Sequence, residues 1–204
     1  MPRKSEMLLM TFVKNPELGK AKTRLAKTIG QGKALEVYKA LLSHTCSIVA
    51  DLKVDKIVFY ADKICYDDIW SSNIFKKDLQ AGGDLGERMS GAFETAFELG
   101  YKKVIIIGSD CYDINQEIIL EGFSELDNKD VIIGPALDGG YYLLGMKKLY
   151  KEIFIDKSWS TNDLMKETLA TLENLDLSYN LLTPLSDVDI EEDLKGELLS
   201  IVKN

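Results

Sequence analysis

The sequence contains one histidine, His44, and only three cysteines in 204 residues. A single histidine inside a segment with helical apolar spacing, residues 33–50, gives little support to a Ser-His-Asp triad or a histidine-rich zinc site. The cysteines, Cys46, Cys65 and Cys111, form no Cys-x-x-Cys pair. A sparse, odd set of this kind is typical of a reducing compartment rather than of a disulfide framework. We therefore expect a cytoplasmic protein.

Long apolar runs and an excess of positive charge are also missing. No apolar stretch approaches the roughly 20 residues that span a bilayer, so we expect no membrane span. The formal net charge is -8, which disfavours nucleic acid as a partner, because nucleic-acid binders present a basic face. The four prolines are scattered, and no linker, repeat or low-complexity tract divides the chain. Its length suits one domain, residues 1–204.

What the sequence does contain is an alternation of apolar runs and helical patterns. The uninterrupted run Val104–Ile107 is typical of a central parallel strand that is covered on both faces. The β-α-β-α order predicts an α/β fold, a three-layer α/β/α sandwich with a mixed, mostly parallel sheet. The link before Tyr141–Met146 is too short for a parallel crossover, so that strand is expected to run antiparallel or to turn away from the sheet.

The remaining elements are expected from the same patterns. Ser160 or Thr161 is placed to cap the fourth of the expected helices. The expected strands are Leu8–Val13, Ile57–Ala61, Val131–Ile133 and Leu181–Leu182, and the expected helices are Lys33–Ala50, Leu85–Leu99, Gln116–Leu126, Asn162–Leu172 and Ile190–Val202.

Basic residues concentrate at the start of the chain. Residues 1–24 hold six Lys or Arg and only two Glu. The segment Lys14–Arg24 follows the first expected strand and leads toward a helix, and helix N-termini bind phosphates together with Lys and Arg side chains. A solvated surface loop is the alternative. The bend between Pro16 and Gly19, and the acidic segments described below, favour a nucleotide phosphate site. Its expected residues are Lys14, Gly19, Lys22 and Arg24.

A second segment, Gln80–Met89, joins an expected loop to a helix. Its glycines would let a ligand approach the backbone closely, and Gln80 carries both a donor and an acceptor suited to the edge of a nucleotide base. The alternative is an ordinary loop-to-helix junction in which Asp84 caps the helix. The nucleotide contacts predicted here are Gln80, Gly83, Gly86 and Met89.

Carboxylates follow the central strand and precede the last helix. Asp110 comes directly after the strand and can hold a hard cation such as Mg²⁺ against phosphate oxygens. Asp187 and Asp189 are two residues apart, so in an extended segment both side chains point the same way and reach one ion. Each also has a structural alternative. Asp110 could cap the following helix, and Asp189 could cap the last one with Glu192 as its partner.

Taken together, these segments resemble a family of bacterial and archaeal proteins. The family has been catalogued as a domain of unknown function and as a selenodomain-associated transferase. The resemblance covers essentially the whole chain and implies the glycosyltransferase-A type, nucleotide-diphospho-sugar transferase fold. One departure is Tyr112, where the family often has a proline that fixes the backbone at the helix entry. The matching segments are Phe12–Leu25, Gln80–Met89, Gly108–Cys111, Gly134–Ala136, Asp138–Gly145, Trp159–Thr161, Leu185–Asp189 and Asp193–Leu194.

The resemblance implies a transferase that uses a nucleotide or nucleotide-sugar donor, a small-molecule acceptor and Mg²⁺ or Mn²⁺. In a distant relative, a guanylyltransferase that acts on phosphoenolpyruvate or phospholactate, the metal is bound by aspartates that look like Asp110, Asp187 and Asp189. Lys22, Arg24 and Asp138 are then the expected catalytic residues, with Asp138 contacting a sugar or serving as base. Glycosyl and nucleotidyl transfer both stay open, as does a regulatory module that binds nucleotide without chemistry. The oligomeric state stays open too.

Overall fold

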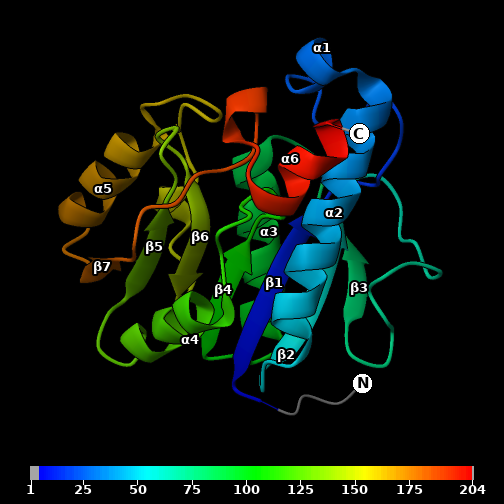
Figure 1. Cartoon of the computed structure of the whole chain (residues 1–204). Helices are drawn as coiled ribbons and strands as arrows, with labels where there is room; N and C mark the ends of the chain where they lie inside the picture. The colour runs from blue at the N-terminus through cyan, green and yellow to red at the C-terminus, as the bar shows by residue number, and fades with distance from the viewer. Residues whose placement is uncertain (1–4, 204) are drawn as a thin grey trace.

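Seven strands form one sheet in the order β3-β2-β1-β4-β6-β5-β7 (Figure 1). The computed structural model describes residues 5–203. Neighbouring strands are parallel, except that β6 runs antiparallel to both β4 and β5, which confirms the expected mixed sheet. The strands are β1 (Met7–Val13), β2 (Asp55–Tyr60), β3 (Lys76–Leu79), β4 (Lys103–Ile107), β5 (Val131–Pro135), β6 (Tyr141–Met146) and β7 (Tyr179–Leu181).

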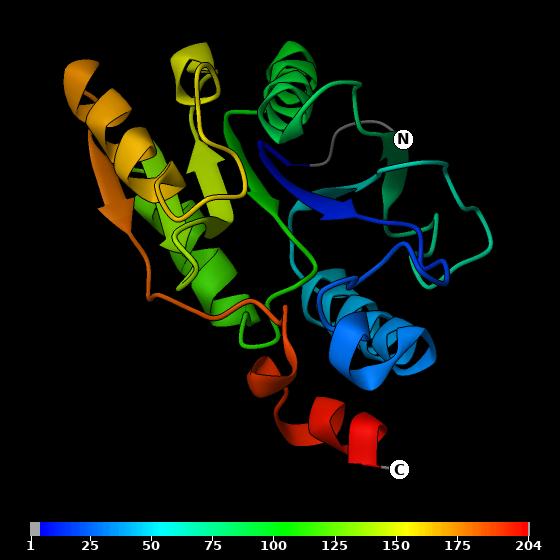
Figure 2. The same ribbon diagram turned by 90° about the horizontal axis from the view of Figure 1, so that it is seen from above.

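Helices cover both faces of the sheet, so the three-layer α/β fold is confirmed. Figure 2 shows α3 and α5 on one side of the sheet and α2 and α4 on the other. None of the helices among residues 5–203 has the length and apolarity that a membrane crossing requires. The helices are α1 (Ala26–Ile29), α2 (Gln31–Ala50), α3 (Leu85–Glu98), α4 (Gln116–Glu125), α5 (Leu164–Asn174) and α6 (Gly196–Lys203), with short 3-10 turns η1 (Lys151–Ile153) and η2 (Glu191–Asp193).

The central strand β4 explains why both faces need helices. Its side chains alternate between two apolar clusters, with Ile105 and Ile107 packed toward α2 and α4 and Val104 and Ile106 packed toward α3. All four are buried, as the β-branched run predicts for a strand covered on both faces. From β1 the chain order runs outward to β2 on one side and to β4 on the other. This switch point is where open α/β sheets bind ligands, outside the carboxyl ends of the strands.

Three local predictions differ from the structure. The strand β3 was not expected, because its four residues Lys-Lys-Asp-Leu show no apolar alternation. The expected cap of α5 by Ser160 or Thr161 was wrong, since α5 begins after Asp163 and has no side-chain cap. The expected terminal helix Ile190–Val202 is broken into η2 and α6, with Gly196 at a φ of 53° at the start of α6.

Candidate functional site

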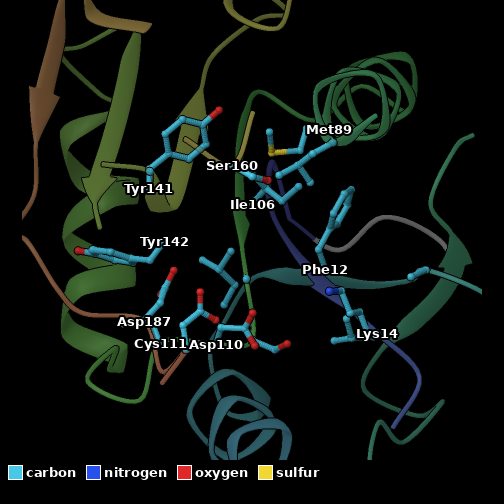
Figure 3. Close-up of a pocket in the computed structure, with 18 of the residues that line it drawn as sticks. Phe12, Lys14, Met89, Ile106, Asp110, Cys111, Tyr141, Tyr142, Ser160 and Asp187 are labelled. Atoms are coloured by element: carbon cyan, nitrogen blue, oxygen red, sulfur yellow. The ribbon is translucent and has the colours of Figure 1, made fainter. Parts of the chain in front are cut away.

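A cleft of about 470 Å³ opens at the carboxyl ends of β1 and β4, at the switch point of the sheet (Figure 3). Most of the residues predicted from the sequence for ligand or metal contact line it. These are Lys14, Lys22, Arg24, Gln80, Met89, Asp110, Asp138, Asp187 and Asp189. Segments from the beginning, the middle and the end of the chain therefore meet in one cavity.

The basic loop after β1 is held in place by polar side chains beneath it. Asn15 is buried, and its side-chain oxygen accepts from the backbone N–H groups of Asp62 and Lys63 while its amide donates to the carbonyl of Lys63. The backbone N–H of Lys14 donates to the Tyr38 hydroxyl at 2.8 Å. Tyr38 also lies within 3.4 Å of the Ser109 hydroxyl, so it joins the loop after β1 to the loop after β4.

Lys22 is the centre of the charged part of the cleft. Its Nζ lies 2.8 Å from Oδ1 of Asp110 and 3.4 Å from Oδ1 of Asp189. Arg24 reaches the other oxygen of Asp189 at 3.3 Å. The Lys22 side chain is only 4% exposed, and its backbone is left-handed with a φ of 51°. A buried lysine with this backbone is held by its surroundings in a conformation that lysine rarely adopts.

The C-terminal segment brings Asp187 and Asp189 to this point. After β7 the chain pairs with the end of β5 through an isolated bridge between Leu185 and Ala136. It then pairs with the residues after β4 through a bridge between Asp187 and Cys111. The backbone N–H of Val188 donates to the Asp110 carbonyl at 2.9 Å. The extended backbone that the Asp-x-Asp pattern requires is therefore present.

Burial and neighbouring carboxylates raise the pKa of Asp187 to about 7. Burial is the largest cause, followed by the negative charges of Asp110 and Asp138, while Lys22 acts in the opposite direction. Burial together with Asp187 also raises the pKa of the Cys111 thiol to about 12. A thiol of that kind is a poor nucleophile, which agrees with a packing role for Cys111.

The carboxylates of the cleft offer hard oxygen donors, the ligand type that Mg²⁺ and Mn²⁺ prefer. Asp187 is buried close to the carboxylates of Asp110 and Asp138, and a bound cation would offset both the burial of its charge and this repulsion. Across residues 5–203, however, no three carboxylate, cysteine or histidine residues already stand close enough together to hold an ion. Lys22 neutralises Asp110 and Asp189 instead. The carboxylate oxygens therefore fit a divalent cation. In this structure Lys22 pairs with two of the expected ligands, Asp110 and Asp189.

The segment Gln80–Met89 contributes side chains, and not its glycines, to the lining of the cleft. The Gln80 amide donates to the backbone carbonyls of Val13 and Phe59, at 3.3 and 3.2 Å, which fixes the side chain across the ends of β1 and β2. Arg88 also lines the cleft, with its Nε donating to the Gly83 carbonyl. Sequence reasoning missed Arg88, although its charge and its place in the segment were visible signals.

The three glycines predicted to contact nucleotide do not line the cleft. Gly19 and Gly83 are at turns with φ values of 78° and 99°, which side-chain-bearing residues rarely adopt. Gly86 lies in the first turn of α3 against the ring of Trp159, and an added Cβ would come within 2.4 Å of that ring. These glycines therefore have conformational or packing explanations, and their contact with nucleotide stays a prediction.

The structural alternatives for the acidic residues are resolved by the capping contacts. Asn115, not Asp110, caps α4. The side chain of Asp193 accepts from the backbone N–H groups of Asp189 and Ile190. The side chain of Asp189 lines the cleft and pairs with Lys22 and Arg24. Asp84 caps α3, as the sequence suggested, and the structure adds a reciprocal contact from Glu87.

Two further residues have defined surroundings. Asp138 lines the cleft, and its Oδ1 accepts from the backbone N–H of Gly140 at 3.0 Å. Its predicted catalytic role stays a prediction.

Tyr112, where the related family often has proline, places its ring 4.7 Å from the ring of His44. This contact anchors the loop after Asp110 on α2.

The mixed sheet with an antiparallel β6, together with a cleft at its switch point, defines a protein with the nucleotide-diphospho-sugar transferase fold. The chain belongs to a family described as uncharacterized proteins conserved in bacteria (DUF2064), which matches residues 45–161, more than half of its length. No curated protein matches the chain.

Solved structures show the same fold. A crystal structure from Desulfovibrio desulfuricans G20, provisionally named a nucleotide-diphospho-sugar transferase, is 29% identical with a TM-score of 0.90, over 98% of this chain and 94% of that one. The inositol-1-phosphate CTP transferase from T. maritima is 13% identical with a TM-score of 0.56, over 98% of each chain. Glucosyl-3-phosphoglycerate synthase from Mycobacterium tuberculosis, solved with Mn²⁺ and UDP, is 10% identical with a TM-score of 0.53, over 89% of this chain and 70% of that one. The last two share the fold alone.

Proposed function

We propose that the protein is a transferase that moves a group from a nucleotide-activated donor to a small-molecule acceptor with the help of Mg²⁺ or Mn²⁺. The observation that carries the proposal is the position of the Lys22 Nζ, 2.8 Å from Asp110 and 3.4 Å from Asp189. Phosphate-binding cations and metal-binding carboxylates are thereby within reach of the same ligand. The names of structures with this fold, which include nucleotidyl and glycosyl transferases, support the same class of reaction.

The nucleotide would bind along the ends of β1, β2 and β4. Lys14, Lys22, Arg24 and Arg88 supply positive charge for its phosphates, and charge-assisted hydrogen bonds of this kind are among the stronger ones. The N–H groups of Gln80 are used by the backbone. Its carbonyl oxygen is therefore the group that would accept a hydrogen bond from a base.

Asp110, Asp187 and Asp189 would hold the divalent cation. When bound, the ion neutralises charge on the donor phosphates and on the departing group. The Lys22 ammonium would then exchange its carboxylate partners for a phosphate oxygen. Asp138, which lines the same cleft, would contact the acceptor or the transferred group.

Two reaction types are compatible with this arrangement. In nucleotidyl transfer an acceptor oxygen attacks the α-phosphorus of an NTP and pyrophosphate leaves. In glycosyl transfer an acceptor hydroxyl attacks the sugar carbon and a nucleoside diphosphate leaves. Both need the same positioning and the same stabilisation of developing negative charge.

A panel of NTPs and sugar nucleotides, each with and without Mg²⁺, tests the proposal. We expect at least one nucleotide to raise the melting temperature in a Mg²⁺-dependent way. Released pyrophosphate identifies nucleotidyl transfer, and released nucleoside diphosphate identifies glycosyl transfer. Stabilisation without turnover across plausible acceptors would instead support a non-catalytic nucleotide-binding module. No stabilisation by any nucleotide would contradict the proposal.

The metal ligands are tested by Asp110→Asn, which keeps the size of the side chain and removes its charge. We expect this variant to lose the Mg²⁺-dependent part of the melting shift. Asp127→Asn is the matched control, because Asp127 is an exposed aspartate that pairs with Lys103 and does not line the cleft. A Mg²⁺ response in Asp110→Asn equal to that of the parent protein would contradict the assignment.

A further inference from the structure

Tyr141 carries a buried polar atom that the fold leaves without a partner. Of the buried side-chain nitrogen and oxygen atoms in residues 5–203, the Tyr141 hydroxyl is the one that makes no hydrogen bond. Other buried tyrosine hydroxyls are satisfied. The hydroxyl of Tyr142 donates to the Thr183 carbonyl at 2.9 Å, and that of Tyr60 donates to Asp68 at 2.6 Å. Burying a hydroxyl without a hydrogen-bond partner costs free energy, so an unpaired one calls for a functional explanation.

The position of Tyr141 indicates a role in ligand binding. Tyr141 is the first residue of β6 and lines the cleft. Its ring meets that of Trp159 edge-on, with centroids 6.5 Å apart and an interplanar angle of 83°. Other residues of the cleft wall, among them Met89 and Leu144, belong to the same apolar cluster. One end of the cleft therefore combines aromatic and aliphatic surface with one unpaired hydroxyl, which is covered in the ligand-free protein.

This end of the cleft lies apart from the charged groups. In Figure 3 Tyr141 is separated from Asp110 and Asp187, and its hydroxyl points away from them. Lys22 and Arg24 are tied to the carboxylates of Asp110 and Asp189. A ligand with its phosphates among those charges would present an uncharged part to Tyr141. Aromatic rings and single hydroxyl groups are well suited to a moiety with both apolar C–H faces and hydroxyl groups.

We infer that Tyr141 determines specificity by hydrogen-bonding a hydroxyl of an uncharged, polyhydroxylated moiety, a sugar ring or a polyol, which packs beside Trp159. The inference rests on the proposed function, because it places the rest of the ligand in the charged part of the cleft. The moiety belongs either to the nucleotide-activated donor or to the acceptor.

Trp159 is the neighbour that we expect to move when a ligand reaches the Tyr141 hydroxyl. Since the Tyr141 hydroxyl is covered, a neighbouring side chain must shift when a ligand reaches it. Trp159 belongs to the irregular segment between η1 and α5, in which Asp156 and Ser160 have φ values of 52° and 63°. Unlike Met89 of α3 and Leu144 of β6, Trp159 is not held in a helix or strand.

The first test needs no ligand and compares Tyr141→Phe with Tyr60→Phe. Tyr60 is a matched control, because its buried hydroxyl has a partner and it does not line the cleft. We expect Tyr141→Phe to melt at the temperature of the parent or higher, by up to roughly 2–4 °C, while Tyr60→Phe melts lower. A fall in melting temperature for Tyr141→Phe as large as that for Tyr60→Phe would overturn the inference, since it would show a satisfied hydroxyl.

The second test measures binding with matched probes in the presence of Mg²⁺. UDP-glucose, GDP-mannose and ADP-glucose are each compared with their nucleoside diphosphates, which tests a donor sugar. Glucose, myo-inositol and glycerol are titrated into nucleotide-saturated protein, which tests an acceptor. We expect Tyr141→Phe to bind at least one hydroxylated probe roughly tenfold more weakly than the parent. Its affinity for the nucleoside diphosphates should be unchanged, as should all affinities of Tyr60→Phe.

The outcomes separate this inference from the proposed function. If the parent binds nucleotides and Tyr141→Phe binds every hydroxylated probe as the parent does, the inference is wrong and the proposed function stands. The same conclusion follows if no hydroxylated group adds affinity to the parent. If the parent binds no nucleotide at all, the proposed function fails and the inference falls with it.

Discussion

At the scale of single residues, Lys22 shows how one side chain can prepare a site for its ligand. It is buried, it has a left-handed backbone, and it is shared between Asp110 and Asp189. In the ligand-free protein it keeps carboxylates of like charge close together. A nucleotide with its metal ion would compete with these ion pairs. Its phosphate attracts the Lys22 ammonium, and the metal ion attracts the carboxylates of Asp110 and Asp189.

Replacing Lys22 with glutamine is therefore expected to have two effects of opposite sign. Nucleotide affinity should fall by roughly tenfold or more, because a phosphate partner is lost. Mn²⁺ affinity of the ligand-free protein should rise, because the ion no longer competes with an ammonium for Asp110 and Asp189. Isothermal titration with MnCl₂ and with the nucleotide that gives the largest melting shift measures both effects.

The control for that prediction is Lys27→Gln, since Lys27 is an exposed lysine of α1 that does not line the cleft. It should leave both affinities unchanged. If Lys22→Gln lowers Mn²⁺ affinity together with nucleotide affinity, Lys22 supports the carboxylates rather than competing with the ion.

At the scale of elements, the packing of α3 against the η1–α5 segment explains a glycine whose role the sequence left ambiguous. Gly86 permits the ring of Trp159 to lie against the first turn of α3. A contact between residues so far apart in the chain cannot be read from the local pattern of Gln80–Met89. Local patterns did identify the cap at Asp84, because a capping box is contained within four residues.

Gly86→Ala should destabilise the protein by about 1–3 kcal/mol, since its Cβ would meet the Trp159 ring at 2.4 Å and force the ring to move. Gly32→Ala in α2 is the matched control. An added Cβ there meets nothing within 4 Å, and the change should stabilise the helix by roughly 0.5 kcal/mol. Urea unfolding measures both, and equal effects of the two substitutions would contradict the proposed contact.

Strand β3 and the C-terminal segment are two parts of the fold that local sequence patterns did not predict. The sequence Lys76–Leu79 forms an edge strand because β2 offers a free edge, and no apolar periodicity is needed for that pairing. The expected helix Ile190–Val202 had a suitable apolar pattern. The break falls at Leu194 and Lys195, where Leu194 has an extended backbone with a ψ of 129°, and it allows α6 to pack on α2.

At the scale of the whole molecule, topology explains why a site could be predicted from segments far apart in the chain. Parallel strands place their carboxyl ends on one edge of the sheet, so the segments after β1 and β4 had to converge there. The apolar run of β4 identified the central strand of the sheet. The short link before β6 indicated that the sheet is mixed. The sequence did not reveal which charges pair, because Lys22, Asp110 and Asp189 meet only through packing.

The C-terminal segment joins the cleft to the α2 side of the molecule. Val188, between the two aspartates, belongs to the same apolar cluster as Leu198 of α6 and Leu41 of α2. Leu198 is fully buried and does not line the cleft. The position of Asp187 and Asp189 therefore depends on packing at a distance from the ligand.

Leu198→Ala should lower the free energy of unfolding by about 2–4 kcal/mol, through lost burial and the cavity left behind. It should also weaken Mg²⁺-dependent nucleotide binding at temperatures where the variant is folded, because the segment that carries Asp187 and Asp189 loses its anchor. Leu172→Ala in α5 is the matched control, since Leu172 is equally buried in the cluster on the other face of the sheet. It should cost similar stability without affecting binding. If both variants weaken binding alike, general loss of rigidity is responsible and the C-terminal anchor is not.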